Sequence, residues 1–184
     1  MPSVCFYFEV HQPYRLKPYG ALQVGRDHEY FDEKLNAEVL RKVADKCYLP
    51  ANHSMLRLIE RTDGRFRVSY SITGVAIEQM KKYAPKVMDS FVRLADTGAV
   101  EFVAETYYHS LAALYDKDEY KEQIDMQVGL VQKEFGQTPR VYHSSGVNPI
   151  SGIGSASTPS TNPSASSVRQ TKRNDPEIAP RQAL

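Results

Sequence analysis

Apolar residues along this chain recur with two periods, one typical of strands and one typical of helices. Alternating aromatic and β-branched positions predict strands at residues 4–10, 66–73 and 99–104, with a fourth strand starting at 140–142. Apolar positions three or four apart predict helices over residues 33–48, 50–61, 74–83, 85–94 and 116–135. In the first of these helices, Leu35, Val39 and Val43 form the predicted apolar stripe. The alternation of strands and helices predicts parallel βα units and therefore an α/β fold.

The first predicted strand ends in polar side chains. Pro13 has no N–H for a sheet ladder, so the strand stops at His11 and Gln12. Glu9 and His11 share one parity, and we expect both to face the side opposite to Phe8. Parallel α/β enzymes carry their sites at the carboxyl ends of strands. His11 and Gln12 are therefore candidate site residues, although a simple turn in which a neighbour satisfies His11 fits the pattern equally well.

The third predicted strand ends in a similar way. Glu101 lies within it, and Tyr107, Tyr108 and His109 follow it. Aromatic rings offer flat apolar surfaces, and the other groups offer hydrogen bonds. This mixture suits a sugar, which has apolar ring faces and hydroxyl groups on its rim. Each tyrosine alone indicates packing rather than binding, but two strand ends of similar composition favour a binding site.

Composition narrows the class of partner. The 184 residues carry a net charge of +1, which gives no electrostatic reason to expect nucleic acid or an anionic membrane as a partner. No apolar run approaches the roughly 20 residues of a membrane span, and the start of the chain lacks the pattern of a signal peptide. Cys5 and Cys47 make no disulfide framework. We expect a cytoplasmic protein.

Several other chemistries lack their motifs. The five histidines include no His-x-x-x-His pair, and the two cysteines are far apart. There is no phosphate-binding P-loop and no Gly-x-Ser-x-Gly nucleophile elbow. We therefore expect no metal site and no cofactor.

The periodic pattern stops near residue 143. Residues 144–184 contain no Phe, Tyr or Trp, and residues 151–168 are mostly Ser, Thr, Pro, Gly, Ala and Asn. Such a segment buries too little apolar surface to offset an ordering entropy of about 1–2 kcal/mol per residue. We expect an ordered part over residues 1–143 and a disordered low-complexity tail over residues 144–184.

Three stretches, in their order along the chain, resemble glycoside hydrolase family 57, whose members act on α-glucans. The first family motif ends in His-Gln-Pro, as residues 11–13 do. The second motif is matched by Gly98, Glu101, Tyr107, Tyr108 and His109. Residues 71–79 are similar to the intervening segment of amylase-like members, and residues 135–141 to the lead-in to the third motif. The resemblance covers about residues 3–142.

This resemblance implies a partial (β/α)7 barrel, an incomplete relative of the TIM barrel, and retaining hydrolysis or transfer at α-glucosidic bonds. The implied partner is an α-glucan or a maltooligosaccharide. The implied substrate-binding residues are His11, Gln12, Glu101, Tyr107, Tyr108 and His109.

Retention requires two carboxyl groups about 5–5.5 Å apart. In the family the nucleophile is a Glu on the strand that begins at residues 140–142. This chain has Gly146 or a neighbour at the position of that Glu. The family's acid/base Asp lies much further along the sequence. We therefore expect the N-terminal part of such an enzyme, without catalytic carboxylates and inactive alone. Glu9, Glu101 and Glu105 remain, and we expect Glu101 and Glu105 to orient a neighbour or bind a hydroxyl.

Two alternatives stay open. One is a non-catalytic remnant that binds carbohydrate through the tyrosine and histidine residues named above. The other is a truncated product that does not fold, because an open parallel sheet leaves backbone groups unpaired at its edges.

Overall fold

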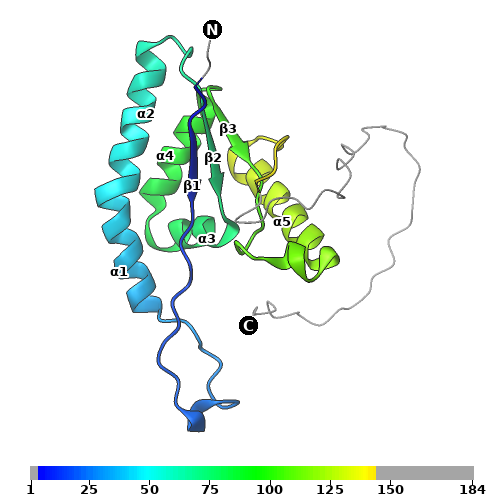
Figure 1. Ribbon diagram of the computed structural model, residues 1–184. Helices are drawn as coiled ribbons and strands as arrows, with labels where there is room; N and C mark the ends of the chain where they lie inside the picture. Colours follow the sequence, from blue (N-terminus) through cyan, green and yellow to red (C-terminus); the bar gives the residue numbers. More distant parts are fainter. Residues whose placement is uncertain (1–3, 144–184) are drawn as a thin grey trace, which may run out of the picture. The chain divides into compact units, whose positions relative to one another are not determined.

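Three parallel strands form the sheet of this protein, in the order β1-β2-β3 (Figure 1). They are β1 (Tyr7–Val10), β2 (Val68–Ile72) and β3 (Val100–Val103). The computed structural model describes residues 4–143. The predicted α/β organisation is confirmed for this part of the chain, whereas the predicted tail and its boundary at residue 143 lie outside the described residues and stay predictions.

Helices connect the strands and follow them. The longer ones are α1 (Glu33–Val43), α2 (Leu49–Arg61), α3 (Gly74–Tyr83), α4 (Pro85–Asp96) and α5 (Lys117–Phe135). The short segments are η1 (Ala21–Gln23), the π-helical η2 (Ala44–Tyr48) and η3 (Ala112–Leu114). None of these described helices is long and apolar enough to cross a membrane.

Local chemistry sets the ends of two helices that the sequence predicts. The Thr73 side chain accepts from the Ala76 N–H and starts α3. Asp116 accepts from the first N–H groups of α5, and Gly136, with φ of 67°, ends that helix in the left-handed region. The predicted helices at residues 74–83 and 116–135 are confirmed to within one residue.

The predicted helices at residues 33–48 and 50–61 form one continuous run, in which η2 joins α1 to α2 (Figure 1). Proline inside a helix disturbs the regular hydrogen bonds, and the wider π turn ends at Tyr48, two residues before Pro50. The run therefore accommodates Pro50 without ending.

The buried stripe of α1 differs by one position from the predicted stripe. Asn36 and Leu40 are buried, and Ala44 in η2 continues the same row. Leu35 is 39% exposed. The stripe shifts because the Asn36 side chain binds the backbone of Arg15, which a count of apolar residues does not include.

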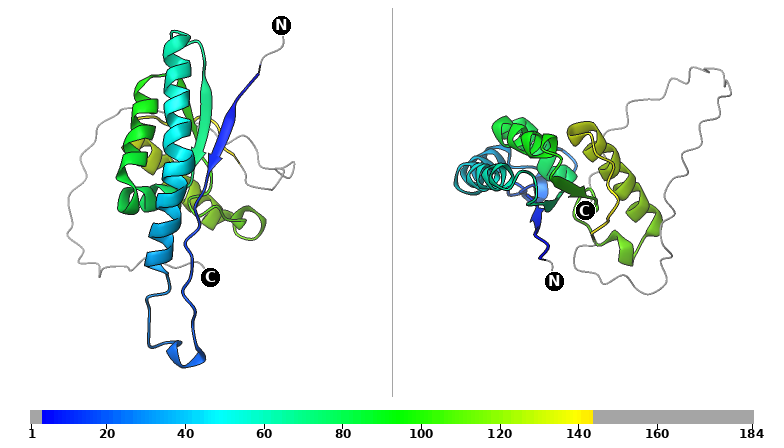
Figure 2. Two further views of the ribbon diagram at one scale, coloured as in Figure 1. Left: turned by 90° about the vertical axis from the view of Figure 1, so that its left-hand side faces the viewer. Right: turned by 90° about the horizontal axis from the view of Figure 1, so that it is seen from above.

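The hydrophobic core lies between one face of the sheet and the helices. The sheet contributes Val10, Tyr70, Ile72 and Phe102, all of one parity in the strand register. The helices α1 to α5 supply most of the remaining core, and Figure 2 shows helices beside the sheet. The other face carries Tyr7, Glu9, Ser69, Ser71 and Glu101. The predicted split of β1 into an apolar face and a polar face is confirmed.

A fourth strand begins beside β3. Ala104 forms a parallel bridge with Tyr142, and its N–H donates to the Val141 carbonyl at 2.9 Å. The His143 N–H donates to the Ala104 carbonyl at 2.7 Å. The chain therefore adds its strands in sequence order, as successive βα units do.

Because Tyr70 is buried in the core, we expect the chain to lose stability at alkaline pH. Tyr70 is 4% exposed, and burial raises the pKa of its hydroxyl to about 12. The unfolded chain ionises Tyr70 near pH 10, so the stability that this residue contributes is full below pH 10 and is lost between pH 10 and 12. At pH 11 we expect a loss of about 1.4 kcal/mol.

Urea unfolding of the wild-type chain and Tyr70→Phe at pH 8 and pH 11 measures this loss. We expect the variant to lose about 1.4 kcal/mol less than the wild type between these pH values. Tyr115→Phe is the control, because Tyr115 is 86% exposed. Equal losses of unfolding free energy in the wild type and Tyr70→Phe would show that burial does not raise the pKa of Tyr70.

Candidate functional site

The polar segments that follow β1, β2 and β3 meet at the carboxyl edge of the sheet. His11 Nδ1 lies 3.0 Å from Thr73 Oγ1. The imidazole of His11 stacks on that of His109, with 4.3 Å between ring centroids and 20° between planes. The histidines of the two sequence motifs are therefore neighbours in space.

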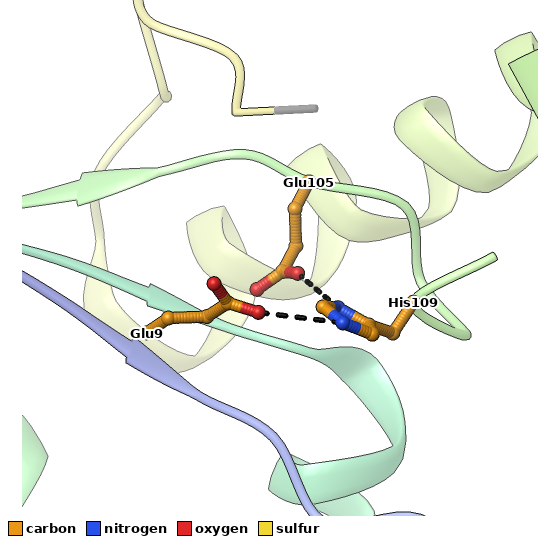
Figure 3. A group of neighbouring side chains, drawn as sticks. All are labelled: Glu9, Glu105 and His109. Atoms are coloured by element: carbon orange, nitrogen blue, oxygen red, sulfur yellow. Dashed lines mark hydrogen bonds and ion pairs between the residues drawn. The ribbon is translucent and has the colours of Figure 1, made fainter. Parts of the chain in front are cut away.

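His109 owes its position to a turn after β3. Its φ is 56°, in the left-handed region that residues other than glycine rarely adopt, and its N–H donates to the Thr106 carbonyl at 3.0 Å. The turn brings the imidazole back to two carboxylates (Figure 3). Its Nδ1 forms a hydrogen bond with Glu105 Oε2 at 3.0 Å, and its Nε2 lies 3.4 Å from Glu9 Oε1.

The two carboxylates differ in environment. Glu105 is fully buried, and burial raises the pKa of its carboxyl group, although the neighbouring His109 and Ser71 side chains partly oppose this shift. The Glu9 side chain is 35% exposed and has its second oxygen 3.6 Å from His143 Nε2. One oxygen of Glu9, one of Glu105 and one ring nitrogen of His109 lie within 4.8 Å of one another.

The charge state of His11 follows from its surroundings. Burial, and then the neighbouring His109, lower the pKa of His11 below its usual value, with Glu9 acting in the opposite direction. His11 is therefore neutral at pH 7, and its imidazole offers one donor and one acceptor.

Two tyrosine residues directly precede His109 in the chain. The rings of Tyr107 and Tyr108 meet edge to face at 4.9 Å. The Tyr107 hydroxyl donates to Glu78 Oε1 at 2.6 Å, and the Tyr14 hydroxyl donates to Glu78 Oε2 at 3.1 Å. Burial first, and then the hydrogen bond to Glu78, raise the pKa of Tyr107 far above its usual range. Tyr107 is 8% exposed, whereas Tyr108 is half-buried and accessible to a ligand.

Gln12 and Glu101 do not join this cluster. The Gln12 side chain donates to the Tyr48 hydroxyl at 3.0 Å, toward the helical run rather than toward His11. Glu101 pairs in register with Ser69, near the amino ends of the strands, and lines a groove of about 640 Å³ there. At about 3.3 Å per residue it is about 13 Å from Glu105 along the strand. Sugar binding by these two residues stays a prediction.

Three residues of the site were not among the six predicted substrate-binding residues, although Glu105 was expected to orient a neighbour or bind a hydroxyl. Glu9 and Glu105 face the same side of the sheet as His11, and strand parity indicated this for Glu9. The spacing of Glu105 and His109 gives no such signal, because their contact depends on the left-handed turn. Glu78 extends from α3 to Tyr107, a contact that only the packing of α3 reveals.

The cluster offers hydrogen-bond donors, acceptors and ring surfaces along one edge. Glu9 and Glu105 are close enough to be compared with a retaining pair of carboxyl groups. Both, however, contact the imidazole of His109, which lies beside the pair in Figure 3 and engages one oxygen of each. The predicted loss of the nucleophile at Gly146 lies outside the described residues and stays a prediction.

Comparisons with known proteins agree on one family. The model of Glycosyl hydrolase family 57 matches residues 5–146. A protein of Methanocaldococcus jannaschii with the provisional name alpha-amylase is 45% identical over 142 residues, which are 76% of this chain and 30% of that protein. The chain thus spans about a third of the length of this relative.

Solved structures share the fold at low sequence identity. The 4-alpha-glucanotransferase of Thermococcus litoralis has a TM-score of 0.52 at 19% identity, covering 73% of this chain and 18% of that enzyme. A family 57 branching enzyme of Thermococcus kodakaraensis also has a TM-score of 0.52, at 14% identity, covering 77% of this chain and 32% of that enzyme. The match of the family model over most of the chain, with the relative of 45% identity, shows that this chain belongs to glycosyl hydrolase family 57.

Proposed function

We propose that this chain binds α-glucans or maltooligosaccharides at the carboxyl edge of its sheet and does not cleave them by itself. The observation that carries the proposal is the stacking of His11 on His109, which directly follows Tyr108 in the chain, because it joins both sequence motifs in one wall. Such a wall offers ring surfaces and hydrogen-bond groups together, as a saccharide requires. Family membership supports an α-glucan as the ligand.

The proposed architectural role is that of the first part of a (β/α)7 barrel. Successive parallel strands β1, β2 and β3, followed by the bridge at Tyr142, support this arrangement. The likeness in fold to a glucanotransferase and a branching enzyme also supports it. Residues 1–143 would then hold the sugar, as part of a site for hydrolysis or transfer.

A second candidate function is cleavage by Glu9 and Glu105 as a retaining pair. The closeness of their carboxylate oxygens favours it. Against it stands the imidazole of His109, which engages one oxygen of each carboxylate. Binding without cleavage is therefore the function that the geometry supports best.

Replacing Tyr108 tests the binding wall. We expect Tyr108→Ala to weaken maltoheptaose binding about tenfold in isothermal titration calorimetry, because the loss of a half-exposed aromatic surface costs about 1.4 kcal/mol. Tyr115→Ala is the matched control and should bind as the wild type does, since Tyr115 is 86% exposed and outside the cluster. Equal affinities of Tyr108→Ala and the wild type would place the sugar elsewhere.

A further inference from the structure

One carboxylate oxygen in the cluster has no donor. Glu105 is fully buried, and its Oε2 is bonded to His109 Nδ1. Its Oε1 has no hydrogen-bond partner among the described residues. In Figure 3 this second oxygen points toward the Glu9 carboxylate. A buried carboxylate oxygen without a donor is costly, so a positive group should lie beside it.

The described neighbours of Glu105 leave its Oε1 without a donor. The imidazole of His109 contacts Oε2 of Glu105 and Oε1 of Glu9. His143 contacts Glu9 on its other oxygen, at 3.6 Å from Oε2. A cation between the two carboxylates would satisfy Glu105 Oε1 and remove their mutual repulsion.

We propose that Glu9, Glu105 and His109 bind one divalent transition-metal ion of the zinc class. One imidazole nitrogen with two carboxylate oxygens is a donor set that Zn²⁺ accepts, with a fourth position left open. Donors on tetrahedral zinc are about 3.3 Å apart, given bond lengths near 2.0 Å. Side-chain rotation can contract the present spread of up to 4.8 Å to this value. This site differs from the expectation of no metal, which rested on sequence spacing alone.

A metal ion can reach the site from solvent, and two of its three ligand residues are held in place. The side chains of Glu9 and His109 are 35% and 27% exposed, so an ion can enter from solvent. Glu105 is fixed by burial, and His109 by its turn. The same exposed side leaves the fourth coordination position to water or to a sugar hydroxyl. The cation site does not depend on sugar binding.

Calorimetric titration of the EDTA-treated full chain with Zn²⁺ tests the proposal. We expect one equivalent of Zn²⁺ to bind and to raise the melting temperature. Glu105→Gln and Glu9→Gln should each weaken this binding at least tenfold. Glu101→Gln is the matched control, because it changes a carboxylate on the same face of the sheet outside the cluster, and its affinity should equal that of the wild type.

A second readout uses the wild-type chain alone. Co²⁺ in place of Zn²⁺ should give visible d–d absorption without the thiolate charge-transfer band that Cys5 or Cys47 would cause.

If Glu105→Gln does not fold, the affinity of Glu9→Gln for Zn²⁺ decides the test, because the Glu9 side chain is partly exposed and its replacement should not prevent folding. Absence of Zn²⁺ binding in the wild type would indicate that a shared proton balances the carboxylates, and binding unaffected by both variants would place the ion elsewhere. Either result overturns the proposal. Maltoheptaose is titrated separately, so the two proposals can fail independently.

Discussion

Phe102→Ala is expected to lower the free energy of unfolding by about 3–5 kcal/mol, because it removes a buried aromatic ring and leaves a cavity. Phe102 is 1% exposed, and its ring stacks on Phe135 of α5 with 4.0 Å between centroids. It also contacts Tyr70 of β2, so one side chain joins the sheet to α5. Urea unfolding followed by circular dichroism measures the loss.

The Phe102→Ala change should also affect the candidate site, because β3 leads directly to Glu105 and His109. A loss of this size is a large part of the 5–15 kcal/mol that stabilises a typical domain. Phe8→Ala serves as the control, since Phe8 faces the same side but is 40% exposed, and its loss should be less than half as large. Equal losses for the two variants would contradict the position of the core on this face.

Gly74→Ala is expected to destabilise the chain by about 1–3 kcal/mol and to weaken saccharide binding. A Cβ at Gly74 would lie 2.4 Å from atoms of the Tyr107 ring. The ring has little room to move, because Tyr107 is buried and its hydroxyl is bonded to Glu78. The substitution must therefore displace α3 or Tyr107, and Tyr108 with it. Urea unfolding and maltoheptaose calorimetry measure the two effects.

Gly129→Ala is the matched control for Gly74→Ala. Gly129 lies in α5 with open space around its Cα, so alanine there should stabilise the chain by about 0.5–1 kcal/mol through helix propensity. Adding Tyr107→Ala to Gly74→Ala should cost less than the sum of the two single changes, because the clash disappears. Full additivity, or a stable Gly74→Ala, would refute the contact between α3 and the Tyr107 ring.

The sequence predicts the fold well where periodicity and local chemistry agree. Helix α3 begins at Gly74 because Thr73 can cap it, and both signals are local. The joining of α1 to α2 through η2 was not predicted, since Pro50 reads as a helix boundary when packing is ignored. The one-residue shift of the α1 stripe has a similar cause, because Asn36 is buried by a contact with Arg15.

The sequence predicts only part of the site, because some of its contacts depend on how distant elements pack. Strand parity and the carboxyl-end rule bring His11 and His109 together, and the structure shows their rings stacked. The partner of Gln12 is Tyr48, which only the packing of the helical run against the strand end could reveal. Glu105, rather than Glu101, joins the cluster, because β3 ends at Val103 and the left-handed turn at His109 follows it.

Incubation of the wild-type chain with maltoheptaose tests the central claim most directly, when binding is followed by calorimetry and products by chromatography in the same sample. Binding with an unchanged oligosaccharide profile is the predicted result. Release of shorter or longer glucans that Glu105→Gln abolishes would contradict the account, because Glu9 and Glu105 would then form a working catalytic pair.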